Sequence, residues 1–130
     1  MAALTTQLGY PVDADEQARR LAPLLASDRD AVLLVVDADD LAIGWIHVHH
    51  RLFLEGADQA LIAGLVVDET HRSSGLGAAL LREAEAWASA RGLRSVRVQS
   101  RVERAEAHRF YQRHGYTVTK QSLVFDRRLD

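Results

Sequence analysis

A polar, glycine-containing loop joins an apolar strand-like run to an amphipathic helix. Residues 60–67 are apolar and β-prone, and residues 68–77 are mostly polar. Residues 75–91 then carry leucine, alanine and tryptophan at the spacing of one helix face. This order predicts a strand that passes through a tight loop directly into the N-terminus of a helix, a geometry that suits anion binding.

The loop has the residues that a phosphate group needs. A helix N-terminus offers unpaired backbone N–H groups and about half a positive charge. Gly75 and Gly77 let an anion approach the backbone because no Cβ intervenes. Arg72 adds a full positive charge at the mouth of the loop. The loop therefore predicts a diphosphate site, although two glycines can also simply begin a helix in a tight turn.

Two well-known phosphate loops do not match. No Lys-Ser/Thr pair follows Gly77, as the Walker loop requires, and Leu80 stands where the dinucleotide fingerprint needs its third glycine. The predicted diphosphate site therefore belongs to another class.

Helices and strands are expected along the rest of the chain. Asp13 and Glu16 resemble a capping box at the start of a helix that Pro23 can shorten or bend. Gly64, inside a strand, predicts a bulge or a close backbone approach. The expected strands are 31–36, 41–54, 60–67, 95–99, 116–119 and 123–125. The expected helices are one that stops at 8–11, one that Asp13 caps, and two at 75–91 and 103–114. This is a mixed α/β order in one domain, 1–130.

Composition excludes several classes of protein. The chain has no cysteine, so disulfides, thiolate metal sites and thiol nucleophiles are ruled out. No apolar stretch approaches the roughly 20 residues of a membrane span, which favours a cytoplasmic protein with no membrane partner. A pI near 6.3 and dispersed basic residues do not favour nucleic acid.

Charge is unevenly distributed. Residues 1–65 carry a net charge of −6 and residues 66–130 a net charge of +4. A basic second half suits an anionic ligand and an acidic first half a cationic one, but ordinary surface variation produces the same asymmetry.

Two motifs resemble those of the GNAT superfamily of N-acetyltransferases. Arg72, Gly75 and Gly77 match its acetyl-coenzyme A signature R/Q-x-x-G-x-G/A, and residues 107–116, with Tyr111, match its A-x-x-F/L-Y-x-x-x-G-F/Y segment. The resemblance runs from about residue 7 to the C-terminus. It implies a mixed, mostly antiparallel central sheet, splayed at a β-bulge, with helices on both faces. The family's opening strand is missing here, and a homodimer or a truncated start would account for the exposed sheet edge.

The resemblance also implies a ligand set. Acetyl-coenzyme A is the expected co-substrate, with no metal. Arg104, which stands where many members carry an asparagine, is expected to reach a phosphate or to face solvent. Main-chain atoms of the strand are expected to bind the pantetheine and acetyl group, and loop amides the pyrophosphate; these residues are Leu65, Val66 and Val67, then Arg72, Ser73, Ser74, Gly75, Leu76 and Gly77.

The implied reaction is direct attack of a primary amine, on a small molecule or a peptide, on the thioester. Tyr111 aligns with a family tyrosine that protonates the departing thiolate as general acid; outside the motif it would be assigned to core packing. Leu61 stands nearest the position of the family's glutamate base, so that base is absent. The residues that could replace it, each with a surface or structural role as the alternative, are His47, His49, His50 and Glu55. A coenzyme A-binding sensor or scaffold without turnover is the alternative function.

Overall fold

The computed structural model describes residues 1–8, 10–72 and 74–130. They form two compact units, Met1–Gln99 and Ser100–Asp130. The first unit contains a sheet with three α-helices, and the second contains one helix and the C-terminal segment. The predicted helix stop at Gly9 and the predicted contact at Ser73 lie outside the described residues. A single domain over 1–130 stays a prediction.

The sheet of the first unit has four strands. They are β1 (Asp30–Val36), β2 (Ala42–Arg51), β3 (Gln59–Val67) and β4 (Val96–Val98), in the order β1-β2-β3-β4. The first three pair antiparallel, and β4 pairs parallel with β3. The mixed, mostly antiparallel sheet is thus confirmed. The predicted end of the second strand, at residue 54, is wrong: β2 ends at Arg51, and the exposed Leu52 and Leu54 follow it in a loop.

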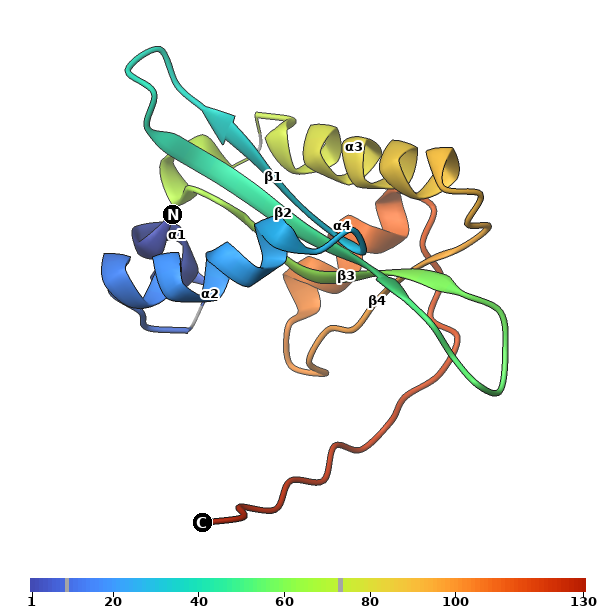
Figure 1. The fold of residues 1–130 in the computed structure, drawn as a ribbon. Coiled ribbons are helices and arrows are strands. Elements are labelled where there is room, and N and C mark those ends of the chain that lie inside the picture. Colours follow the sequence, from blue (N-terminus) through green and yellow to red (C-terminus); the bar gives the residue numbers. More distant parts are fainter. Residues whose placement is uncertain (9, 73) are drawn as a thin grey trace. The chain divides into compact units, whose positions relative to one another are not determined.

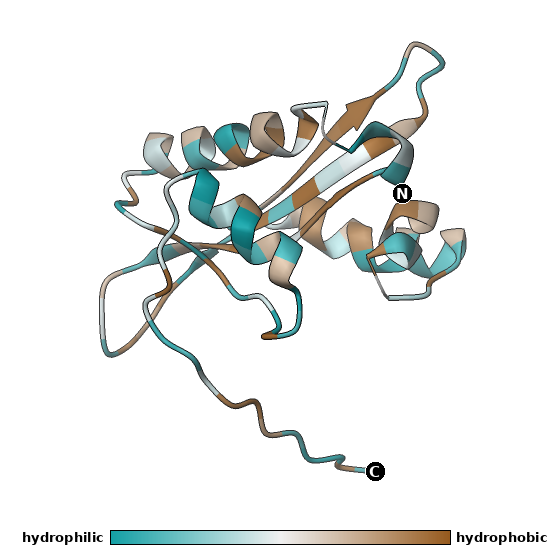
Figure 2. Ribbon diagram, turned by 180° about the vertical axis from the view of Figure 1, so that it is seen from behind, coloured by the Kyte–Doolittle hydropathy of each residue, from teal (hydrophilic) through white to brown (hydrophobic). Residues whose placement is uncertain are grey.

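Helices cover both faces of this sheet, as expected (Figure 1). They are α1 (Ala2–Gln7), α2 (Ala14–Ala26) and α3 (Leu76–Ala90). Successive strand residues point to opposite faces. Accordingly, Leu80 of α3 packs over Gly44, whereas Trp45 packs with Leu4 of α1 on the other face. The strands between these helices are among the most apolar parts of the ribbon (Figure 2).

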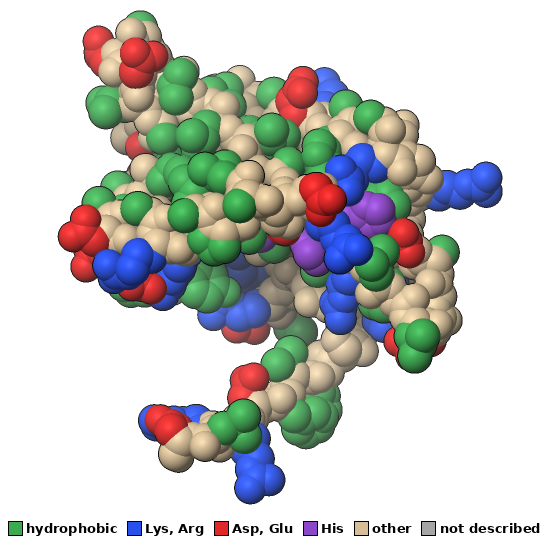
Figure 3. Space-filling model, in the orientation of Figure 1, with side chains coloured by type: hydrophobic (Ala, Val, Ile, Leu, Met, Phe, Trp, Pro, Cys, Tyr) green, Lys and Arg blue, Asp and Glu red, His purple; other side chains and the backbone are tan. Residues whose placement is uncertain are grey.

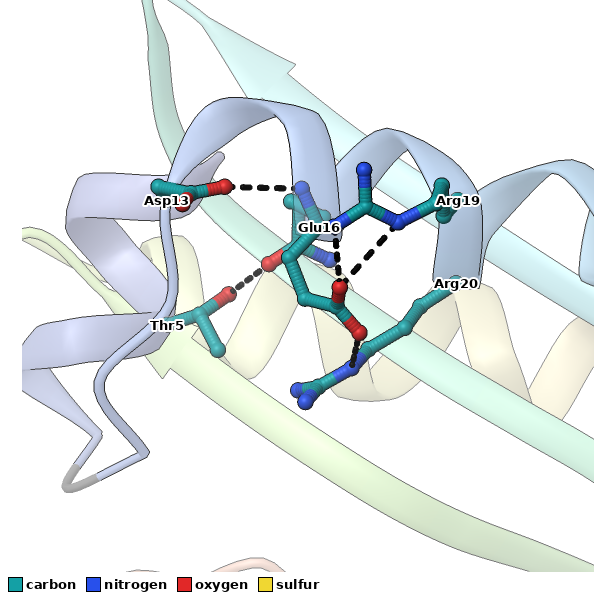
Figure 4. Close-up of polar contacts among 6 residues, drawn as sticks. Thr5, Asp13, Glu16, Arg19 and Arg20 are labelled. Atoms are coloured by element: carbon teal, nitrogen blue, oxygen red, sulfur yellow. Dashed lines mark hydrogen bonds and ion pairs between the residues drawn. The ribbon is translucent and has the colours of Figure 1, made fainter.

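The start of α2 confirms half of the predicted capping box. The Asp13 carboxylate accepts a hydrogen bond from the Glu16 backbone N–H at 2.8 Å (Figure 4). The Glu16 carboxylate does not return to Asp13; it pairs with the guanidinium groups of Arg19 and Arg20. Pro23 lies inside α2 and does not end it.

Gly64 combines a bulge with a close approach, and both readings of this glycine are confirmed. His47 pairs with Gly64 and Val48 with Ile62, so Ala63 is the extra residue on β3. A Cβ built on Gly64 would lie 2.7 Å from Cη2 of the Trp45 ring. Only glycine therefore leaves room for the Trp45 ring beside β3 at the bulge.

We expect Gly64→Ala to destabilise the fold by about 1–3 kcal/mol, because the added methyl group overlaps the Trp45 ring and must displace it. Urea unfolding measures this change. Gly56→Ala is the matched control, since a Cβ on Gly56 meets nothing within 4 Å. Equal stability of the two variants would contradict the close approach.

Glycine ends two helices as predicted. Gly92 (φ 79°) follows α3, and Gly115 (φ 91°) follows α4 (Ala105–Arg113) in the second unit. In each case the N–H of the glycine and the N–H of the residue after it donate to carbonyls of the last turn, as in a Schellman motif.

The two C-terminal strands predicted at 116–119 and 123–125 are wrong. Residues 117–130 lie outside any helix or strand, and their apolar side chains, such as Val124 and Phe125, are exposed. The residues have strand propensity, but strand formation also requires a partner for the backbone. Over the described part of the chain, no helix is long and apolar enough to cross a membrane.

Candidate active site

The C-terminal half of β3 has an open edge. Pairing with β4 stops at Ile62, one residue before the bulge. The Asp68 N–H donates to the Ile43 carbonyl at 2.7 Å, which fixes the antiparallel alternation. Main-chain groups of Val66 therefore bond to β2, while those of Leu65 and Val67 point away from it. No strand of the described residues pairs with Leu65 and Val67 on that side, and we call this the open edge of β3.

The loop after β3 is organised by its own side chains. The Asp68 carboxylate accepts from the backbone N–H and the hydroxyl of Thr70, and these bonds hold the pKa of Asp68 below its ordinary value. Ser74 donates to the His71 carbonyl. Arg72 is exposed, and its Nε donates to the Val67 carbonyl at 3.3 Å. The guanidinium therefore stays beside the open edge.

Gly75 is the N-cap of α3 and has a φ of 85°. It has no side chain with which to cap the helix, and a Cβ built on it would meet nothing within 4 Å. Among the described residues, Ala79 is the first whose N–H bonds to a carbonyl of this helix end, that of Gly75. The preceding N–H groups of the first turn have no partner in the part of the chain that the structure describes and can bind an anion.

The second unit places Tyr111 in α4 with Arg104 at its N-cap. Tyr111 is half-buried, and burial raises the pKa of its phenol, against a smaller opposite effect of the Arg104 charge. Its ring meets Phe110 and Tyr116 edge-on, with centroids 5.2 and 5.8 Å away. A raised pKa keeps the phenol protonated at neutral pH, as a general acid requires.

A hollow of about 430 Å³ lies between α1, α2 and the sheet. Ala63, the bulge residue, lines it, so the hollow reaches the point where β3 and β4 part. The Trp45 indole N–H at its wall is buried and has no hydrogen-bond partner among the described residues. Its lining carries none of the acidic charge expected for a cationic ligand; it consists of Met1, Thr5, Leu8, Tyr10, Gln17, Arg20, Leu21, Leu24, Val32, Trp45, His47 and Ala63.

Two histidines share one carboxylate on this face. His47 Nε2 lies 2.7 Å and His49 Nδ1 2.9 Å from Asp30 Oδ1. The Asp30 side chain is only 8% exposed. Burial raises the pKa of Asp30, but hydrogen bonds from His47, Ser27 and His49 together lower it by more. The pKa of Asp30 is therefore below its ordinary value. Histidine side chains lie beside basic ones on the face that carries α2 (Figure 3).

The other base candidates lie elsewhere. His50 points to the opposite face of β2, where it lies 2.9 Å from Asp58 Oδ2 and accepts from Arg91 Nε at 3.2 Å. Glu55 is exposed in the turn after β2. Among the described side chains, no cluster of three or more His, Asp or Glu is arranged to hold a metal ion. The structure thus brings together the predicted strand and loop residues, and separately Tyr111 with Arg104.

Sequence reasoning missed Asp30. The signal available to it was the alternation of His47 and His49 on one strand face; the carboxylate partner follows only from the register that pairs Asp30 with His49.

Comparison with known proteins identifies the family. The model of the Acetyltransferase (GNAT) family matches residues 3–116. The chain belongs to the GNAT family. An aminoglycoside N(6′)-acetyltransferase type 1 of Stenotrophomonas maltophilia is 31% identical over 123 residues, covering 92% of this chain and 80% of the relative. Family and relatives make the chain an N-acetyltransferase.

Solved GNAT structures share this fold. The aminoglycoside 6′-N-acetyltransferase AAC(6′)-Ih from Acinetobacter baumannii superimposes with a TM-score of 0.84 at 20% identity, over 99% of this chain and 90% of that one. AAC(6′)-Iy, in complex with the bisubstrate analogue CoA-S-monomethyl-acetylneamine, also gives 0.84, at 21% identity over 98% and 88% of the two chains.

Proposed function

We propose that this GNAT protein transfers the acetyl group of acetyl-coenzyme A to a primary amine of a small molecule or peptide, by direct attack of the amine on the thioester. The observation that carries the proposal is the continuity of two features. The open edge of β3 ends at Val67, and eight residues later the chain reaches the uncapped start of α3 at Gly75. An extended amide-containing arm with a diphosphate at one end fits this pair of sites.

The donor is held mainly by backbone groups. Leu65 and Val67 present N–H and C=O groups to the pantetheine arm, while Val66 holds β3 against β2. The amides of residues 72–77 bind the pyrophosphate, and the Arg72 guanidinium adds a positive charge. Gly75 fits this role because a positive φ and open space bring backbone, and no side chain, to the anion.

The second unit supplies the acid. The Tyr111 hydroxyl gives its proton to the departing thiolate, and its raised pKa keeps that proton in place until then. Arg104 is assigned to a phosphate of the donor. Backbone N–H groups of β3 stabilise the oxyanion that forms when the amine attacks.

The acceptor occupies the hollow between α1, α2 and the sheet, which reaches the bulge through Ala63. Aminoglycosides are the first class to test, because the relatives' names specify them. The lining is largely apolar and contains one arginine, Arg20. We therefore include amines attached to an apolar group in the panel of acceptors.

A homodimer is part of the proposal. β1 is one of the two edge strands of the sheet, and Leu34 and Val36 on it are each 48% exposed. A second copy along this edge would cover its unpaired backbone groups.

The proposal is tested by release of free coenzyme A thiol with neamine, spermidine, glycinamide and phenethylamine, alongside calorimetric titration of acetyl-coenzyme A. We expect binding, and turnover with at least one amine. Binding without turnover across the panel would support the sensor alternative. An absence of binding to the folded protein would contradict both.

A further inference from the structure

The hollow contains one side chain that can accept a proton at neutral pH. The guanidinium of Arg20 has only donors. The hydroxyl and amide groups of Thr5, Tyr10 and Gln17 are poor proton acceptors. The Trp45 indole N–H is a donor only, and the other lining side chains apart from His47 are apolar. An ammonium group bound in the hollow can therefore lose its proton to a lining side chain only at this imidazole.

The hydrogen bond to Asp30 fixes which nitrogen of His47 is basic. An ionised carboxylate only accepts hydrogen bonds, so the nitrogen that faces it carries the hydrogen. His47 faces Asp30 with Nε2, at 2.7 Å, which leaves the lone pair on Nδ1. His49 faces the same oxygen with Nδ1, at 2.9 Å. Both rings thus donate to one buried carboxylate, and neither uses its second nitrogen for this contact.

The position of His47 matches the site of reaction in the proposed function. It pairs with Gly64 across the bulge, and both it and Ala63 line the hollow. The bulge is also where pairing with β4 ends and the open edge of β3 begins. Leu61, which stands nearest the position of the family's glutamate and pairs with His49, supplies no base. The neighbouring strand, β2, presents a base, His47, on the same face of the sheet.

We propose that His47 is the catalytic base of this enzyme and that Asp30 is the residue that positions it. The inference rests on the proposed function. His47 Nδ1 takes one proton from the bound ammonium, and the freed lone pair forms the C–N bond. The oxyanion that results collapses and breaks the C–S bond, and Tyr111 gives its proton to the departing thiolate. The nitrogen then loses its second proton, which returns through solvent to the Tyr111 phenolate, while the proton on His47 passes to solvent.

Charged and titratable groups around His47 come from several segments. Asp30 faces it from β1, and His49 lies two residues along β2. Arg20, Tyr10 and Met1, which carries an α-amino group, line the same hollow. Asp30 stabilises the imidazolium that forms during the reaction, whereas Arg20 opposes it.

The kinetic test compares His47→Gln and Asp30→Asn with His50→Gln. The last is a matched control, because His50 makes the same kind of contact with Asp58 on the opposite face of β2. With the best amine of the panel, we expect His47→Gln to lower kcat by about 10²–10³-fold, the range typical of general bases. Asp30→Asn should lower it less, and His50→Gln should leave it within about threefold of wild type.

The pH profile separates a base from a structural residue. Wild-type kcat/KM should fall on acidification, because a protonated imidazole accepts no further proton. In His47→Gln that limb should disappear, leaving a rate that follows the neutral fraction of the amine. Unchanged rate and profile in His47→Gln, with an active wild type, would overturn the role of His47 alone. An inactive wild type that binds acetyl-coenzyme A would instead overturn the proposed function, and this inference with it.

The second measurement does not depend on turnover. Long-range ¹H–¹⁵N spectra of histidine-labelled protein distinguish the two imidazole tautomers. We expect His47 in the Nε2–H form above neutral pH, with a change of form or of shift in Asp30→Asn. An Nδ1–H form of His47 in the wild type would overturn the proposal, since Nδ1 could then accept no proton.

Discussion

Replacing Gly75 by aspartate is expected to weaken acetyl-coenzyme A binding by about a hundredfold or more, which corresponds to ~3 kcal/mol. The new carboxylate would stand at the N-cap of α3, where the first-turn amides are proposed to hold a diphosphate. Two like charges about 4 Å apart near a protein surface repel by roughly 4 kcal/mol. Because the space around Gly75 is open, the loss would come from charge and not from a clash. Calorimetric titration of the folded variant measures it.

Gly92→Asp is the matched control for Gly75→Asp. Gly92 has a similar φ, 79° against 85°, and a Cβ on it also meets nothing within 4 Å. It lies at the opposite end of the same helix, so an aspartate there brings the same backbone strain and the same charge without approaching the predicted diphosphate. We expect Gly92→Asp to lower stability but to keep the dissociation constant of the wild type. Tight binding by folded Gly75→Asp would disprove the loop assignment.

Tyr111→Phe is expected to lower kcat by about 10²-fold while the dissociation constant of acetyl-coenzyme A changes little. The substitution keeps the ring, and with it the edge-on contacts to Phe110 and Tyr116, but removes the proton that the thiolate needs. Burial raises the pKa of the phenol, so its acid form persists to higher pH than that of a free tyrosine. Loss of wild-type activity through ionisation of Tyr111 should therefore begin only in alkaline solution.

Two comparisons make the Tyr111 experiment specific. Tyr116→Phe removes a hydroxyl from the neighbouring ring, at a position where the motif accepts phenylalanine, and should keep wild-type turnover. Single-turnover thiol release by both variants, at saturating donor and amine, then isolates the chemical step. If Tyr111→Phe transfers acetyl at the wild-type rate, the tyrosine has only a packing role, and the acid must be sought elsewhere.

Local sequence signals predicted the parts of this fold that depend on local chemistry. The Asp13 cap, the glycine ends at Gly92 and Gly115, and the glycine start at Gly75 each follow from a backbone requirement of one or two residues. Gly64 is the most informative case, because a glycine inside an apolar strand indicated a bulge, and the structure explains it by the Trp45 ring.

The features that sequence reasoning missed depend on pairing between distant segments. The contact of Asp30 with His47 joins residues 17 positions apart and exists only in one strand register. The hollow is formed by α1, α2 and three strands, and no single segment indicates it. The two predicted C-terminal strands were wrong for the same reason: residues with strand propensity do not determine whether another strand lies beside them.

The Trp45 indole at the wall of the hollow is an intrinsic fluorescence probe of ligand binding. The chain has two tryptophans, Trp45 beside Gly64 and Trp87 on α3 with the Arg91 guanidinium over its ring. Indole emission responds to the polarity around the ring and to a new acceptor for its N–H. In a Trp87→Phe variant, Trp45 would be the only tryptophan. Binding of an amine could then be followed by tryptophan fluorescence in unlabelled protein, before the C–N bond forms.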